Sequence, residues 1–187
     1  STLYVRESAR AVRDESSRII AYQGSVEDVT EHVTRMKRLE RMNALLDAVR
    51  DVNQLIARVK DSTRLIDRAC QILVETGGYP TAWIAVVEEG APRHVAQAGF
   101  DELPDGVIDA LAHGELRIGG TDALSMTGVC LTGEPADPHL AALYARQRLM
   151  ATRLEHAGSI RGLLSVSLPP DVEVDEREKA LFPRPWG

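Results

Sequence analysis

The spacing of apolar and polar residues divides the chain into segments of different period. Residues 4–14 and 18–27 alternate loosely with a period of two, which is typical of half-buried strands. The polar cluster at 14–17 between them predicts a turn, so the two segments should form an antiparallel hairpin. Because a hairpin of two strands is only marginally stable alone, we expect this one to pack against other protein.

A long amphipathic helix is predicted directly after the hairpin, over residues 29–59. Asp28 with Glu31 three residues later has the spacing of a helix cap, and no proline or glycine occurs between residues 25 and 76. Such a helix is about 45 Å long. Apolar residues in its second half follow the 3-4-3-4-3 spacing of a coiled-coil seam, and we predict that they lie between two copies of the chain: Met42, Leu45, Val49, Val52, Ile56 and Val59. The apolar spacing up to Met36 and the spacing from Met42 onward do not belong to one continuous register. This stretch of the helix is therefore a candidate for an element that packs in two alternative ways.

The rest of the sequence predicts an α+β fold, in which an antiparallel sheet is flanked by helices. Asp61 or Ser62 begins a second helix, which ends at Gly77 and Gly78. The nearly continuous apolar run 82–87 is typical of a central strand covered on both faces. We also expect strands at 94–100, 150–156 and 160–168, and helices at 104–113, 138–148 and 175–182. Residues 114–136 are rich in glycine, threonine and serine and are predicted to be a loop.

Composition narrows the possible functions only modestly. With 187 residues the chain holds one domain and a remainder, and its net charge of −6 argues against nucleic acid as the main partner, because phosphate binding needs a cationic face. No uncharged stretch approaches the length of a membrane span, and no signal peptide pattern occurs. Two cysteines are too few for a disulfide framework, so we expect reduced thiols in the cytoplasm. From both ends of the sequence we expect a segment of a larger protein.

No catalytic constellation is visible in the sequence, and we therefore expect a protein that is not an enzyme. The five histidines lack the spacing of metal ligands or of a phospho-accepting histidine, and no phosphate-binding loop occurs, so no metal site is predicted. Cys70 lies on the apolar side of the second helix and is expected in the core. For Cys130, in the glycine-rich segment, an inert thiol is favoured over a reactive one.

Two segments near the N-terminus, YVRESARAVRDE at 4–15 and YQGSVEDVT at 22–30, resemble the last hairpin of a PAS sensor domain. Asp28, Val29 and Thr30 are similar to the D-[IV]-T junction of that family with a signalling helix. The resemblance implies a PAS hairpin over residues 1–28 and a coiled-coil linker helix over 29–60. Since the other elements of a PAS domain are not in this sequence, no PAS pocket can be assigned to it.

Further segments follow in a characteristic order: ACQILVE at 69–75 with GGY at 77–79, AWI at 82–84, AQAGF at 96–100, RGLLSVSL at 161–168 and DERE at 175–178. Together they resemble a GAF domain of multidomain bacterial and archaeal sensors, and the similarity extends over 43–182. We assign residues 61–187 to this domain and expect its closing helix to be cut off. Related GAF domains often carry a cysteine pair before the fourth strand, whereas this chain has only Cys130, farther upstream. That difference weakens the case for metal or thiol chemistry.

The resemblance implies a cytoplasmic sensory module of a two-component system, of the sensor histidine kinase type. A small molecule would bind between the sheet and residues 104–148, and a dimeric helix would pass the signal to an output domain. The residues expected to face that pocket, with core packing as the equal alternative for each, are Trp83, Ala85, Gln97, Cys130 and Met150. No ligand or cofactor is identified. Two alternatives remain: a ligandless unit for dimerisation and signal coupling, and a GAF-fold redox enzyme such as a methionine sulfoxide reductase, which needs reactive cysteines in partnership.

Overall fold

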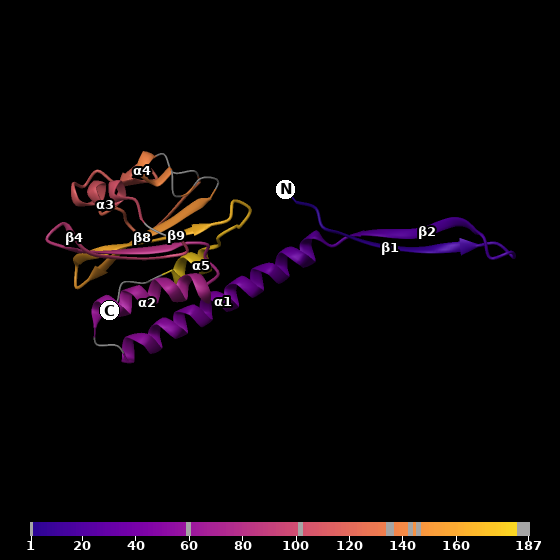
Figure 1. The fold of residues 1–187 in the computed structure, drawn as a ribbon, viewed down its shortest axis with the longest axis horizontal. Coiled ribbons are helices and arrows are strands. Elements are labelled where there is room, and N and C mark those ends of the chain that lie inside the picture. Colours follow the sequence, from indigo (N-terminus) through magenta and orange to yellow (C-terminus); the bar gives the residue numbers. More distant parts are fainter. Residues whose placement is uncertain are drawn as a thin grey trace. The chain divides into compact units, whose positions relative to one another are not determined.

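A computed structural model describes residues 2–58, 61–100, 103–133, 137–141, 144 and 147–182 (Figure 1). The chain divides into two compact units, Ser1–Met42 and Asn43–Gly187, and each is described by itself. One helix, α1 (Thr30–Arg58), starts in the first unit and ends in the second. Its bounds match the helix predicted over 29–59.

The first unit contains the predicted hairpin, formed by β1 (Val5–Arg13) and β2 (Ile19–Asp28). Residues opposite each other in the register share a face. One face is polar and includes the Arg6–Glu27 ion pair and the hydrogen bond between Arg10 and Gln23. The other face is mainly apolar and solvent-exposed: Val5, Ala9, Ala11, Tyr22 and Val26. The hairpin is therefore amphipathic, and both of its strands are exposed almost throughout.

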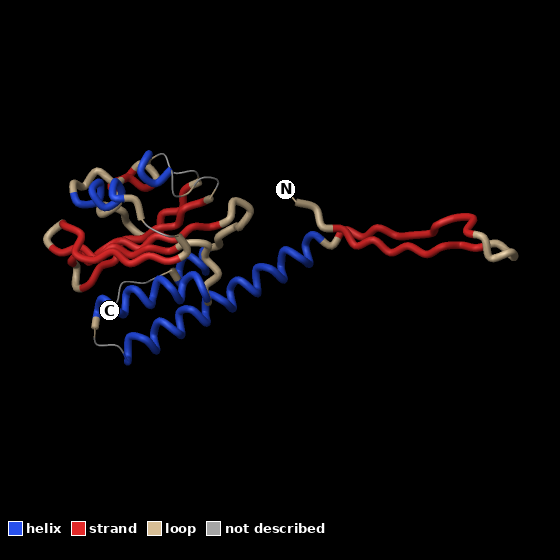
Figure 2. Tube along the Cα trace, viewed as in Figure 1, coloured by secondary structure: helices blue, strands red, loops and turns tan. Residues whose placement is uncertain are grey.

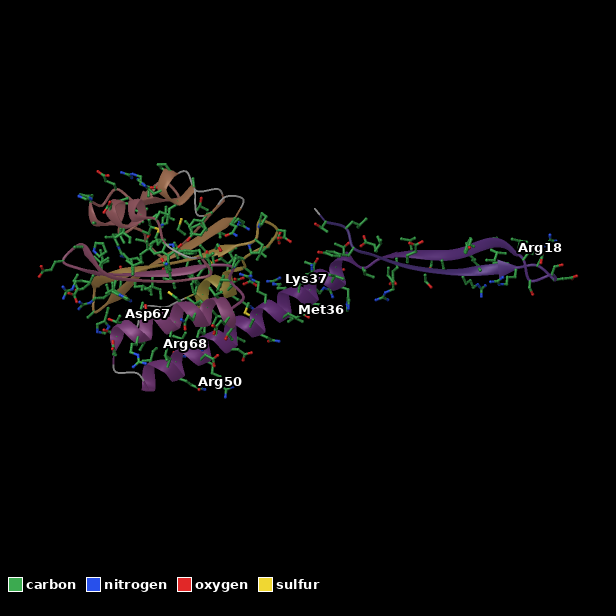
Figure 3. The ribbon with its side chains drawn as sticks, in the orientation of Figure 1. Arg18, Met36, Lys37, Arg50, Asp67 and Arg68 are labelled. Carbon is green, nitrogen blue, oxygen red and sulfur yellow. The ribbon has the colours of Figure 1, made fainter. Side chains whose placement is uncertain are left out.

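Tyr4 ties the hairpin to the first turns of α1. The Thr30 Oγ1 accepts the Tyr4 N–H at 2.9 Å and donates to the Tyr4 carbonyl at 3.3 Å, and the Val29 N–H donates to the same carbonyl at 2.9 Å. Lys37, labelled in Figure 3, donates to the Tyr4 hydroxyl at 2.7 Å, and its Nζ lies 4.6 Å from the centre of the ring. Asp28 accepts the Thr30 N–H, and hydrogen bonds from Thr30 lower the pKa of the Asp28 carboxyl. The start of α1 is thus fixed by both capping and tertiary contacts.

The second unit is built on a five-stranded antiparallel sheet in the order β4-β3-β9-β8-β7. Its strands are β3 (Ala82–Glu88), β4 (Ala91–Ala98), β7 (Val129–Thr132), β8 (Arg148–His156) and β9 (Ser159–Leu168). Its helices, besides the end of α1, are α2 (Ser62–Glu75), α3 (Asp105–Ala112), α4 (Pro138–Ala141) and α5 (Glu176–Leu181). A small hairpin, β5 (Arg117–Ile118) with β6 (Thr121–Asp122), follows α3. The expected α+β fold with an antiparallel sheet is confirmed.

Helices cover both faces of this sheet (Figures 1 and 2). On one face Trp83, Ala85 and Leu163 pack with Val107 and Leu111 of α3 in a first buried cluster. On the other face Ile84, Leu164 and Val166 pack with Ala69 and Cys70 of α2 in a second cluster, which also contains Leu45 of α1. Alternate residues of each strand point to opposite faces, so a central strand covered on both sides is apolar throughout, as the run 82–87 is.

Two predictions in the region 114–148 are wrong. Residues 114–136 are not simply a loop, because they form the β5–β6 hairpin and the edge strand β7. The helix expected over 138–148 does not reach Arg148, which is the first residue of β8. Its described helical part is α4, and residues 142, 143, 145 and 146 lie outside the described residues.

The residues of the predicted dimer seam on α1 differ in burial within the single chain. Leu45 is 2% exposed and belongs to the second cluster, and Val52 packs against the same cluster. The prediction that Leu45 lies between two chains is therefore corrected. Leu45 is a core residue of its own chain. Met42 and Val49 are half-buried, and Ile56 is exposed. Val59 lies outside the described residues.

Candidate functional site

The face of the sheet where a ligand pocket was expected is closed around Trp83 and Ala85. Both side chains are 0% exposed, and both belong to the first cluster, beneath α3. The Trp83 Nε1–H donates to the Tyr144 hydroxyl at 2.7 Å, and that hydroxyl shares a hydrogen bond of 3.2 Å with the Ser165 Oγ. A ligand could reach these two residues only if this layer of side chains moved apart.

The buried Tyr144 hydroxyl holds this polar network together. Burial raises the pKa of Tyr144 to about 12, so the phenol stays protonated at neutral pH and can both donate and accept. A second pair lies along the same strand, where the Thr81 Oγ1 donates to the Ser167 Oγ at 2.8 Å. Buried polar groups that satisfy each other stabilise a core and leave little to attract a ligand.

Gln97 lies on the Trp83 face of the sheet, where it has a structural partner. It is the register partner of Trp83, and its Oε1 accepts the Leu103 N–H at 2.7 Å. This bond fixes the segment that leads into α3. Gln97 therefore positions the covering layer from the edge of the sheet.

Cys130 also shares the Trp83 face, since its register partner Ala151 belongs to the first cluster. The thiol is half-buried, and a Cβ at Gly119 would lie 2.7 Å from its Sγ, so the turn between β5 and β6 passes directly over it. Burial raises the pKa of Cys130. A raised pKa lowers the thiolate fraction and hence the reactivity of the thiol at neutral pH.

Cys70 is separated from Cys130 by the sheet. It is 0% exposed in the second cluster, and burial raises its pKa to about 12. The two cysteines of the chain thus lie on opposite faces, and the structure does not bring them together as a reactive pair.

Met150 is not on the predicted ligand face. Its side chain belongs to the second cluster, and its register partners Val166 and Leu131 pack there too. Its neighbours Leu149 and Ala151 occupy the first cluster. The prediction that Met150 lines the same pocket as Trp83 is therefore wrong, because successive residues of a strand alternate between faces.

Sequence reasoning missed an open cavity of about 400 Å³ at the sheet edge. It lies where β7 begins, and its lining comes from the loop before β7, from β8 and from α5: Met126, Thr127, Gly128, Val129, Thr152, Arg153, Glu155, Lys179, Ala180 and Phe182. Arg153 and Glu155 form an ion pair there. The only feature of the sequence that could have indicated this cavity is the pair of opposite charges, Arg153 and Glu155, two residues apart on a predicted strand. Many surface strands carry such a pair.

Within the described residues, no group of three or more His, Cys, Asp or Glu side chains is placed to hold a metal ion. His94 instead bridges β4 to α2, where its Nε2 lies 2.9 Å from the Asp67 Oδ1. Figure 3 marks Asp67 on α2, next to Arg68. No helix in the described part of the chain is long and apolar enough to cross a membrane.

Solved structures show what this architecture is similar to, although no family model and no curated protein matches the sequence. A GAF domain of a phosphoenolpyruvate-protein phosphotransferase from Coxiella burnetii has a TM-score of 0.55 at 14% identity, covering 75% of this chain and 86% of that one. The nlh2 GAF domain of A. aeolicus has a TM-score of 0.50 at 10% identity, covering 76% and 88%. A free methionine-R-sulfoxide reductase from Neisseria meningitidis, solved with its substrate, has a TM-score of 0.51 at 15% identity, covering 73% and 80%.

The reductase overturns the expectation that the chain is not an enzyme. That expectation rested on the lack of a familiar catalytic pattern, yet an enzyme with bound substrate has the same architecture. Fold alone does not assign function, because one fold supports unrelated activities. At these low identities the likenesses show architecture, and they show that this chain has a GAF fold.

Proposed function

We propose that the chain is a regulatory module of a signal-transduction protein. In this proposal α1 couples a dimer interface to the core of the second unit, which we call the GAF unit after its fold. The observation that carries the proposal is that one side of α1 is buried in the core while another side is exposed. Leu45 and Ala48 are buried, whereas Leu46, on the next position, is 46% exposed. A change in how the exposed side of α1 is packed would therefore act on a helix that is part of the GAF core.

The proposed partner is a second copy of the chain, bound along the exposed side of α1. Leu39, Met42, Leu46, Val49, Asn53 and Ile56 follow a 3-4-3-4-3 spacing on this helix, and we call them the outer stripe. The outer stripe keeps Met42, Val49 and Ile56 of the predicted seam and replaces Leu45 and Val52, which pack in the second cluster. A single asparagine at a core position is a known device for fixing register in two-stranded coiled coils.

The hairpin supports a sensory context for the module. We assign residues 1–28 to the end of a PAS domain and residues 29–60 to the signalling helix, with a cytoplasmic output domain of the histidine kinase type in the full protein. The support is the apolar, exposed face of the hairpin, which needs a covering layer, and the junction of Asp28 and Thr30 with α1.

Around Trp83 and Ala85, the geometry favours the ligandless form of the module over small-molecule sensing. Neither side chain has exposed surface, and the indole N–H of Trp83 already has an acceptor. Native mass spectrometry of the purified chain should accordingly show a dimer in which no bound small molecule depends on Trp83. A molecule that co-purifies, and that is lost on substitution of Trp83, would contradict this part of the proposal.

A charge placed in the outer stripe tests the dimer. Sedimentation equilibrium of the native chain should give a dimer at micromolar concentration, and Leu46→Lys should give a folded monomer because it puts a cation between apolar surfaces. Gln54→Lys is the matched control, since Gln54 is exposed on α1 outside the stripe and the charge change is the same. A monomeric native chain, or equal dimerisation of both variants, would refute the interface.

A second candidate function is a free methionine sulfoxide reductase, which the Neisseria neighbour favours. Cys130, the more exposed of the two thiols, would be the nucleophile. The test is to incubate the chain with free methionine-R-sulfoxide and dithiothreitol and to measure methionine. Turnover that Cys130→Ser abolishes and Cys70→Ser spares would establish the enzyme. Absence of turnover in the native chain would eliminate it.

A further inference from the structure

The sheet edge at the start of β7 is incomplete. β7 pairs with β8 only from Val129 opposite Thr152 to Thr132 opposite Leu149. β8 continues to His156, and over this extension its only partner strand in the described residues is β9. The cavity of about 400 Å³ lies at this step, between the loop before β7 and α5. Its volume is within the range of about 300–1,000 Å³ that small-molecule sites occupy.

Arg153 brings a mostly buried cation to this cavity with spare hydrogen-bonding capacity. Its side chain is 21% exposed; one Nη donates to the Leu124 carbonyl at 3.0 Å and the other pairs with Glu155. Its Nε is buried and has no hydrogen-bond partner. A guanidinium has five N–H donors, and buried donors are nearly always satisfied. The unpartnered donor shows that the guanidinium has hydrogen-bonding capacity left in this position.

The other side chains around the cavity define the kind of molecule that would supply an acceptor. Lys179 adds a second cation, which also pairs with the exposed Glu176 at 2.7 Å, and Glu155 is the single anion among the lining residues. Val129, which is half-buried, and the edges of the buried Met126 and Phe182 give the cavity an apolar wall. A guanidinium binds a carboxylate through two parallel hydrogen bonds, and apolar walls favour an apolar body.

We propose that this edge cavity binds a small organic carboxylate with an apolar body. The carboxylate accepts hydrogen bonds from Arg153 and lies within the field of Lys179, and the body packs against Met126, Val129 and Phe182. Binding requires the guanidinium to turn, so that it exchanges part of its pairing with Glu155 for the ligand. The site is on the sheet edge, away from Trp83, and it does not depend on the dimer proposed above.

The test compares acids with their uncharged amides. Phenylacetate and hexanoate are titrated into the ¹⁵N-labelled chain against phenylacetamide and hexanamide, with binding read from backbone amide shifts. We expect the acids to bind at least about tenfold more tightly, since charge-assisted hydrogen bonds are roughly twice as strong as neutral ones, and to shift the amides of Thr127 and Gly128. Absence of binding, equal binding of acid and amide, or shifts confined to other regions would each overturn the proposal.

Two variants test the charge of Arg153 and the space in the cavity separately. Arg153→Gln should weaken phenylacetate binding by about tenfold or more, whereas Arg161→Gln, at an exposed position of β9, should leave it unchanged. If Arg153→Gln fails to fold, Ala180→Trp decides, because Ala180 is exposed on α5 and a tryptophan there fills the cavity without removing charge. Unchanged binding in a folded Arg153→Gln or Ala180→Trp variant would refute the site.

Discussion

Removal of a single hydroxyl, in Tyr144→Phe, should destabilise the GAF unit by a large share of its folding free energy. Tyr144 is 0% exposed, and its hydroxyl accepts the Trp83 Nε1–H at 2.7 Å and shares a bond of 3.2 Å with the Ser165 Oγ. The variant keeps the ring and creates almost no cavity. It leaves a buried indole N–H without an acceptor and takes one partner from Ser165.

The magnitude follows from those two groups. A buried donor left without a partner costs about 1–3 kcal/mol, and a lost neutral hydrogen bond about 1 kcal/mol, so we expect a loss of about 2–4 kcal/mol. Domains of this kind have free energies of unfolding of about 5–15 kcal/mol. Ser165→Ala should cost only about 1 kcal/mol, because Trp83 keeps its acceptor.

Urea unfolding followed by tryptophan emission measures these changes. In a Trp186→Phe background, Trp83 is the single tryptophan of the chain and reports directly on its own surroundings. Tyr22→Phe is the control, since Tyr22 is 73% exposed on the hairpin and its hydroxyl has no buried role.

The double variant Tyr144→Phe/Ser165→Ala should lose less stability than the two single variants together, because the two hydroxyls interact. A loss under about 0.5 kcal/mol for Tyr144→Phe, which is typical of a surface change, would refute the reasoning. Strict additivity of the two substitutions would refute it as well.

Three further predictions concern thiols, pH and the hairpin junction. In the native chain Ellman's reagent should modify Cys130 and spare Cys70, and both should react in urea; equal native rates would contradict the burial of Cys70. Stability should fall as pH rises from about 9 towards 12, because Cys70 ionises near 9.0 when unfolded but has a folded pKa of about 12, so the unfolded state binds fewer protons. Cys70→Ala should make stability fall less steeply over this pH range. An unaltered slope would contradict the assignment of the decline to Cys70. Thr30→Val should speed hydrogen exchange of the Tyr4 amide by about tenfold, because the variant removes one hydrogen bond from this amide. Thr34→Val, at an exposed position of α1, should leave this exchange unchanged.

Local sequence patterns were sufficient for the elements that carry their own signal. The long helix, the hairpin and the central strand at 82–87 follow from period and apolarity alone. β7 could not be found in this way, because its four residues lie between Gly128 and Gly133 and gain their strand geometry from pairing with β8, which is distant in sequence. Short edge strands are determined by tertiary contacts more than by propensity.

Side-chain placement needed register, which the sequence does not contain. Met150 and Ala151 are equally apolar neighbours, and only the pairing of β8 with β9 decides that Met150 faces α2. A heptad pattern likewise identifies an apolar stripe without identifying what covers it. For Leu45 the covering surface is the chain's own core, and Leu46, one position on, is left exposed.

Amide hydrogen exchange in the dimer and in the Leu46→Lys monomer tests the coupling role of α1 most directly. If α1 links the outer stripe to the GAF core, loss of the dimer should speed exchange at Ile84 and Leu164, the sheet residues that share a cluster with Leu45. Gln54→Lys should leave these amides protected. Unchanged exchange at Ile84 and Leu164 in a folded Leu46→Lys monomer would show that α1 carries no signal to the sheet.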